Sequence, residues 1–205
     1  MKFLLAKKVN MTQVFDEKGM TYPVTVLLAT PNTVIALKDV TRDGYKAVQV
    51  GFGEKREKNI TKPRLGQMGG AKHSHLREYR TDDADLALKV GDALDLTQFK
   101  EGDTVSVMAI SKGKGFQGVV KRHKFKGGRR SHGQKHSERE PGSIGGGGRA
   151  GGRVAKGMRM AGRMGGDRVT VSNLKVIKVL PETGEIMIHG AVPGRRGTVV
   201  EIKSK

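Results

Sequence analysis

The sequence predicts a mainly β protein with a body built as a barrel or a sandwich, a few short helices, and a long, basic, glycine-rich loop. Most periodic segments are short, rich in β-branched residues and bounded by Gly, Pro, Asn or Asp, which is typical of strands. Residues 111–168 differ, because their 58 positions include 17 glycines and only 12 apolar side chains. A segment with so little apolar surface cannot build its own core.

The first strands are expected before the middle of the chain. Residues 22–29 and 33–38 flank Thr30-Pro31-Asn32 and indicate a hairpin-like pair, and residues 45–51 follow the turn Arg42-Asp43-Gly44. A helical or irregular insertion is expected at about residues 53–82. Within it we predict a short helix near Lys62 to Gln67.

Strands resume at residues 104–110, which alternate in the strand period after Glu101-Gly102-Asp103. Beyond the basic segment, residues 169–180 and 185–192 flank a Pro-Glu-Thr-Gly turn, and residues 198–203 form a last strand. Because strands lie on both sides of residues 111–168, this segment is expected to leave and rejoin one body. The predicted domains are therefore a body of residues 1–110 and 169–205 and an extension of residues 111–168.

The charge of the chain is concentrated in the same segment. Residues 111–168 hold 16 Lys or Arg and only three acids, a net charge of +13, whereas the other 147 residues carry +6 of the total of +19. Such a segment repels itself and requires an anionic partner to become ordered. Nucleic acid is the polyanion that fits this density of charge. Once isolated from it, the segment from Lys126 to Arg163 is expected to be mobile and sensitive to proteases.

Glycines beside Lys112 and Lys114 would let a phosphate backbone come close to the chain. A short helix is predicted at residues 117–125, and Gly127-Gly128 would end it. Lys121 and Lys124 lie at helical spacing within this helix. After the four-glycine run, cations recur every three to five residues, which suits a backbone that threads between phosphates. Methionines in this stretch would fill apolar gaps against RNA or pack on the body. The residues expected to contact RNA are Lys7, Lys8, Lys112, Lys114, Lys121, Arg122, His123, Lys124, Lys126, Arg129, Arg130, His132, Lys135, His136, Arg139, Arg149, Arg153, Lys156, Arg159, Arg163 and Arg168.

Other classes of function find little support. Residues 113–118 match GxGxxG with Glu138 about 20 residues onward, but no second parallel strand follows to carry a ribose-binding acid, so no cofactor is expected. The pairs His73/His75 and His132/His136 lack the further ligands of a zinc site. The acids at residues 82–85 have no nucleophile beside them, so we expect neither a metal nor a catalytic site, and no small-molecule substrate.

The chain has no cysteine, which excludes disulfides and fits a reducing cytosol. Its amino-terminal apolar run of four residues is too short for a signal peptide, and no stretch has the roughly 20 apolar residues of a membrane helix. A cytoplasmic protein without a membrane partner is expected. Two alternatives stay open: a DNA-architectural protein with a basic arm in the minor groove, and an oxidoreductase that uses the GxGxxG segment.

A series of motifs resembles the bacterial ribosomal protein L-three family nearly end to end. They are residues 8–15 (KVNMTQVF), 22–26, 43–50, 111–122 (SKGKGFQGVVKR), 131–133, 141–145 (PGSIG), 160–165 (MAGRMG), 167–171 and 190–194 (GAVPG). The resemblance implies a β-barrel body and a loop that penetrates large-subunit rRNA toward the peptidyl transferase centre. It also implies a role in subunit assembly without catalysis, and neighbours among the large-subunit proteins numbered fourteen and nineteen.

The chain departs from that family at three places. Asn10 stands where Gly is usual, and His123 replaces a Trp that commonly follows Lys-Arg. Gly146 occupies a position where the family often has Gln, in some members methylated, so that modification is chemically impossible here.

Overall fold

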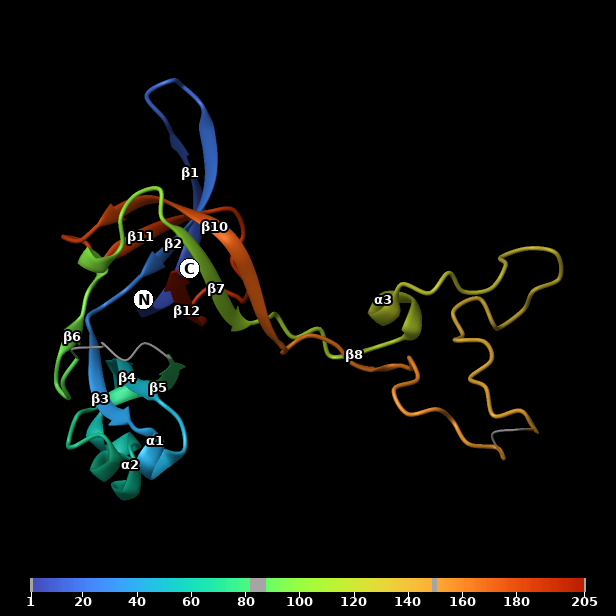
Figure 1. Cartoon of the computed structure of the whole chain (residues 1–205). Coiled ribbons are helices and arrows are strands. Elements are labelled where there is room, and N and C mark those ends of the chain that lie inside the picture. Colours follow the sequence, from blue (N-terminus) through green and yellow to red (C-terminus); the bar gives the residue numbers. More distant parts are fainter. Residues whose placement is uncertain (1, 82–87, 149–150, 205) are drawn as a thin grey trace. The chain divides into compact units, whose positions relative to one another are not determined.

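The computed structural model describes residues 2–81, 88–148 and 151–204 (Figure 1). The chain forms two compact units. We call Met1–Ile110 with Arg168–Lys205 the body, and Ser111–Asp167 the extension. Among the described helices, none has the length and apolar character needed to cross a membrane.

Six strands of the body close into a barrel in which every neighbouring pair is antiparallel. The prediction of a mainly β protein with a barrel is confirmed. Its interior is filled by aliphatic side chains such as Leu27, Ile186, Ile188 and Ile202, all fully buried. Around the barrel the strands are β1 (Phe3–Phe15), β12 (Val199–Ser204), β7 (Thr104–Ile110), β10 (Arg168–Leu180), β11 (Glu185–His189) and β2 (Thr21–Leu28).

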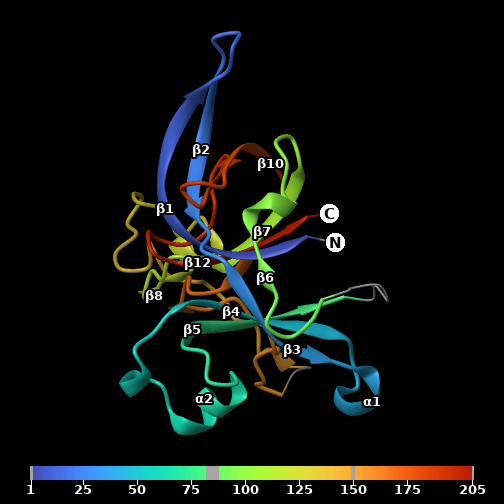
Figure 2. The ribbon, with the colours of Figure 1, turned by 90° about the vertical axis from the view of Figure 1, so that its left-hand side faces the viewer.

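A second, four-stranded sheet lies beside the barrel within the body (Figure 2). Its strands, in spatial order, are β5 (His73–Arg80), β4 (Ala47–Glu54), β3 (Asn32–Lys38) and β6 (Ala93–Leu94). Short helices α1 (Val40–Asp43) and α2 (Lys62–Gln67) occupy its connections, together with a 3-10 turn at Glu57–Asn59. A second 3-10 turn at Leu96–Gln98 leads from β6 to β7 of the barrel. The helix predicted at residues 62–67 is thus present at those residues.

The first four residues of strand β1, residues 3–6, are buried on both faces, which explains their run of apolar side chains. Leu4 belongs to the barrel core, whereas Phe3 and Leu5 belong to a second core that includes Val50 and Tyr79 of the neighbouring sheet. The Phe3 and Tyr79 rings stack with centroids 4.7 Å apart. Because successive side chains of a strand point to opposite faces, a strand between two cores loses the polar alternation that marks a half-buried strand. Sequence analysis did not identify β1 for this reason.

The predicted hairpin of residues 22–29 and 33–38 is wrong, although both strands exist. β2 pairs with β1 and β11 in the barrel, whereas β3 pairs with β4 and β6 in the second sheet. Buried Asn32 makes the crossing: its side chain accepts a hydrogen bond from Leu5 N and donates to Leu5 O, both at 3.0 Å. A third bond to Thr30 O, at 2.9 Å, fixes the turn. The side-chain amide of Asn32 thus pairs with the backbone of β1 in the way that a neighbouring strand would.

The insertion expected at residues 53–82 is not only helical or irregular, because it contains β5. The sequence of β5, HSHLREYR, has no β-branched residue and therefore gives a weak strand signal. β5 pairs with β4 from Ala47↔Arg80 to Glu54↔His73, and this pairing stabilises a strand that its own residues only weakly favour. The neighbouring acidic cluster at residues 82–85 lies outside the described residues.

Truncation inside the barrel should destabilise the body far more than truncation on its surface. We expect Ile202→Ala, at a fully buried site, to lower the free energy of unfolding by about 2–5 kcal/mol. Val90→Ala, at a side chain that is 64% exposed, should change it by less than about 0.5 kcal/mol. Urea denaturation of the two variants checks this, and equal losses would contradict the assigned core.

Candidate nucleic-acid interface

The extension begins and ends as two antiparallel segments that hydrogen-bond to each other. Ser111 N donates to Asp167 O at 2.8 Å, and Lys114 N donates to Met164 O at 2.9 Å. Further out, β8 (Phe116–Gln117) pairs with β9 (Gly162–Arg163). We call this double segment the neck. Its exposed side chains include Lys112 and Lys114, so the neck holds these cations on an ordered backbone.

Close approach of the two neck segments depends on a glycine. Gly165 has a φ of +73°, and a Cβ atom there would overlap the Lys112 carbonyl oxygen. Only glycine avoids both the left-handed strain and the overlap. No local pattern distinguishes Gly165 among the 17 glycines of the extension, because the contact is made by a residue 53 positions away.

Helix α3 (Val119–His123) follows the neck and is shorter than the predicted span of residues 117–125. Gln117 is in β8 instead, and the helix ends at His123, because the next residue, Lys124, caps it with a left-handed φ of 59° before Gly127 is reached. Val119 is buried at 2% exposure and anchors the helix within the extension. Lys121 and Lys124 remain exposed.

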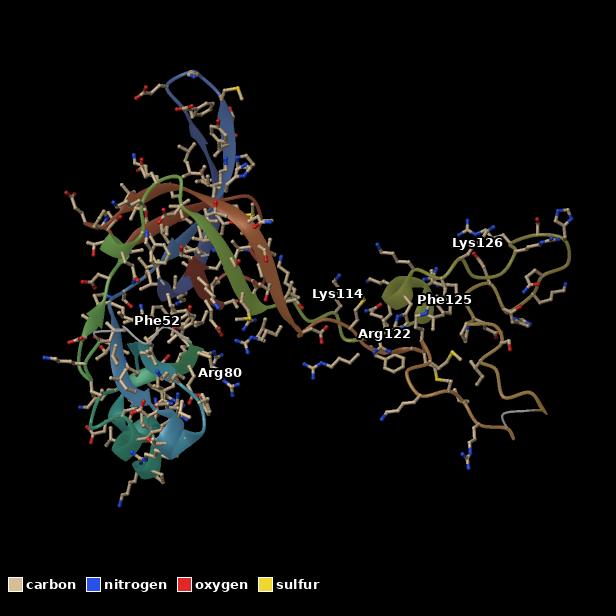
Figure 3. All side chains as sticks on the ribbon, in the orientation of Figure 1. Phe52, Arg80, Lys114, Arg122, Phe125 and Lys126 are labelled. Carbon is tan, nitrogen blue, oxygen red and sulfur yellow. The ribbon has the colours of Figure 1, made fainter. Side chains whose placement is uncertain are left out.

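Two predicted RNA contacts on α3 instead hold the returning chain. Arg122 Nη1 donates to Met160 O at 2.7 Å, and His123 Nε2 lies 3.1 Å from the same oxygen. Both side chains are half-buried. Nearby, the Arg159 guanidinium lies 5.0 Å from the centre of the Phe125 ring, which is cation–π geometry. Figure 3 labels Arg122 and Phe125 beside this helix.

Beyond α3 the chain forms a loop of mainly irregular backbone. Gly128 N donates to Glu138 O at 2.8 Å, and a Cβ atom at Gly127 would overlap that same oxygen, so these glycines let two loop segments touch. Arg130 Nε bonds Glu138 Oε1 at 2.6 Å, and this carboxylate raises the pKa of Arg130. His132 has a left-handed φ of 61°, and it and His136 are exposed.

Most cations of the extension have no carboxylate partner. In its described residues, 111–148 and 151–167, the Arg130–Glu138 contact is the one salt bridge. Figure 3 shows side chains crowded together in the body but standing apart along the backbone of the extension. Arg149 lies outside the described residues. The exposed cations without an ion pair to a described carboxylate are Lys112, Lys114, Lys121, Lys124, Lys126, Arg129, Lys135, Arg139, Arg153, Lys156, Arg159 and Arg163.

Candidates on the body are placed differently from those of the extension. Lys8 is buried, and its Nζ donates to Val192 O at 2.6 Å, so its ammonium is turned into the protein and away from any phosphate. We therefore assign Lys8 a structural role. Lys7 is exposed. Arg168 of the barrel bonds Glu201 at 2.9 Å. Arg77 of β5 bonds the same carboxylate at 3.1 Å, and this second contact joins the second sheet to the barrel.

Sequence reasoning missed a second group of cations on the body. Arg56, Lys58 and Lys62 are exposed on the connection that contains α2, where the charged neighbours Glu57 and Lys72 pair with each other at 2.9 Å. The signal was present in the sequence as the run Lys55-Arg56-Glu57-Lys58. This run is inconspicuous beside the larger charge excess of residues 111–168.

The neck predicts a sharp difference between two glycine substitutions. Gly165→Ala should loosen the neck by about 1–3 kcal/mol, because the added Cβ meets the Lys112 carbonyl and the backbone has a positive φ. Gly147→Ala is the matched control, since nothing lies within 4 Å of its would-be Cβ. Faster hydrogen exchange at the Lys114 and Met164 amides in the first variant alone is expected. The same exchange rates in both variants would refute the constraint.

Comparison with known proteins adds the family to this geometry. The family model described as Ribosomal protein L3 matches residues 72–185. The large ribosomal subunit protein uL3 of Streptococcus pyogenes serotype M1 is 49% identical over 203 residues, which cover 99% of this chain and 96% of that protein. Its counterpart from Herpetosiphon aurantiacus is 48% identical over 201 residues, covering 97% and 94%.

The resemblance stated from the motifs is confirmed, and so is the expectation that the chain is not an enzyme, because proteins of this family are structural components of the ribosome. The alternatives of an oxidoreductase and of a DNA-architectural protein have no support from these relatives. With a family match over more than half of the chain and near-complete alignment to proteins almost half identical, the chain belongs to the ribosomal protein L3 family.

Proposed function

We propose that this chain, a structural constituent of the large ribosomal subunit on the cytoplasmic ribosome, binds the subunit's rRNA mainly through the extension. One observation carries the assignment of the surface. The described extension presents a dozen exposed cations with no carboxylate partner, on a backbone rich in glycine. Cations left unpaired on a glycine-rich backbone are suited to phosphates, which supply the missing negative charge.

The proposed contacts fall into three groups. Lys112 and Lys114 would bind phosphates from the ordered neck, and Lys121 and Lys124 from α3. The loop cations would follow the RNA in several directions, with His132 and His136 as hydrogen-bonding or stacking groups. On the body, exposed Lys7 would contact RNA, whereas buried Lys8 would not. Arg122 and His123 would act indirectly, because they hold the Met160 carbonyl and thereby shape the loop.

Phosphate contacts of this kind position a protein without reading sequence. The mechanism is therefore structural: cations spread along an out-and-back chain neutralise several RNA segments at once and allow these segments to pack together. Glycine supports this role because it lets the backbone itself approach a phosphate. Catalysis is not required of any side chain.

Two finer proposals come from the family resemblance. The extension would reach toward the peptidyl transferase centre, and the body would contact the neighbouring large-subunit proteins numbered fourteen and nineteen. Charge supports the first, because a chain with this excess of cations can enter a region crowded with phosphates. The exposed apolar side chains of the body support a protein neighbour for the second.

Binding of an rRNA fragment should depend steeply on salt. If about six to ten phosphates are neutralised, affinity should fall about a thousandfold or more between about 50 and 200 mM salt. The triple variant Lys121→Gln, Lys124→Gln, Lys126→Gln should reduce the slope of log affinity against log salt by about three. Filter binding or fluorescence titration across a salt series measures both.

A matched control uses three exposed lysines of the body. Lys46→Gln, Lys89→Gln, Lys100→Gln removes the same charge and should leave the slope nearly unchanged. An equal decrease in the two triple variants would show that net charge alone, and not the extension, governs binding. Binding of plain duplex DNA as tight as that of structured rRNA would favour the DNA-architectural alternative.

A further inference from the structure

The hairpin of β1 and β2 continues beyond the barrel as a two-stranded ribbon. β12 pairs with β1 only at Phe3–Lys7, and β11 pairs with β2 only at Val24–Leu28. Among the residues that the structure describes, residues 10–15 therefore pair only with β2, and residues 21–23 pair in the sheet only with residues 13–15. We call residues 10–23 the ribbon, and it projects from the barrel in both Figure 1 and Figure 2. A two-stranded ribbon alone is marginally stable in water.

The ribbon exposes large apolar side chains and almost no positive charge. Met11, Phe15 and Met20 are 49%, 63% and 59% exposed. Its charged residues are Asp16, Glu17 and Lys18, a net charge of −1 in a chain of +19. RNA surfaces are held by cations, so this surface is unsuited to phosphate. Clustered apolar exposure of this kind marks a protein interface.

A groove of about 630 Å³ lies alongside the ribbon within the body. Val14, Phe15 and Tyr22 line one side, and Val176 and Ile177 of β10 line the other. Three carboxylates, those of Asp16, Glu17 and Glu101, lie around it with Lys175 and Lys178. The groove thus offers apolar walls and an acidic excess.

One edge of the ribbon is open for strand addition. On the side of β1 that faces β12, the last recorded contact is Arg196 Nε donating to Val9 O at 2.8 Å. From residue 10 to residue 15 no described strand pairs with that side. An open edge presents unpaired backbone N–H and C=O groups, and these bind another extended chain.

We propose that the ribbon is a protein-docking site, at which an extended segment of a neighbouring large-subunit protein adds to the open edge of β1. The segment would carry apolar side chains for the groove and Lys or Arg for Asp16, Glu17 and Glu101. The proposal rests on the proposed function, because that function places the chain among the basic proteins of the subunit.

Photo-crosslinking in purified large subunits tests the occupant directly. A photoreactive phenylalanine analogue at position 15 should form an adduct with a lysine- or arginine-rich segment of a ribosomal protein, identified by mass spectrometry. The same analogue at Val40, which is 56% exposed on α1, should not form that adduct. An adduct of position 15 with rRNA, or no adduct, would overturn the proposal.

A second measurement separates docking from folding. Met11→Asp with Phe15→Asp should leave the Tm of the free protein and its incorporation into subunits unchanged, because both side chains are exposed. In subunits that carry this double variant and are not crosslinked, retention of the neighbouring protein after a high-salt wash should fall about tenfold or more. The Val40→Asp variant should leave that retention unchanged. Unchanged retention would refute the docking site. Failure of the unsubstituted chain to sediment with large subunits would instead refute the proposed function.

Discussion

The described residues of the extension carry many cations and almost no carboxylates to neutralise them, and this charge imbalance determines what the extension can bind. Its one described salt bridge, Arg130–Glu138, leaves a dozen exposed cations without a carboxylate. A segment with this charge and little apolar surface gains order from a polyanion rather than from its own core. The contacts that it does make are placed at its base, where the neck and the bonds of Arg122 and His123 to Met160 O set the direction of the chain.

The body, in contrast, is held together by its own core, although the extension is inserted in the chain between β7 and β10. Strand β1 lies between two apolar cores and so joins the barrel to the second sheet. The polar contacts at that junction are few and specific: Asn32 pairs with the Leu5 backbone, and Glu201 receives both Arg77 and Arg168. Arg168, the first residue of β10, is thereby fixed at the point where the chain returns to the body.

Sequence patterns predicted the features that depend on local composition. The strand at residues 104–110, the helix at residues 62–67 and the β-barrel class all follow from periodicity, turn residues and family resemblance. The features missed depend on distant partners. β5 is a strand because β4 pairs with it, the strands on either side of residues 30–32 separate because Asn32 bonds Leu5, and Lys8 is buried because Val192 O accepts a hydrogen bond from its Nζ. No pattern within a short window contains these contacts.

Whether rRNA orders the extension is tested by hydrogen exchange of residues 126–163, measured in the free protein and in assembled large subunits. We predict rapid exchange in the free protein, because the described residues of this loop have few internal hydrogen bonds, and strong protection in the subunit, where rRNA would supply partners. Slow exchange in the free protein, equal to that of the barrel strands, would show that the extension is ordered by itself and would contradict a role for rRNA in ordering it.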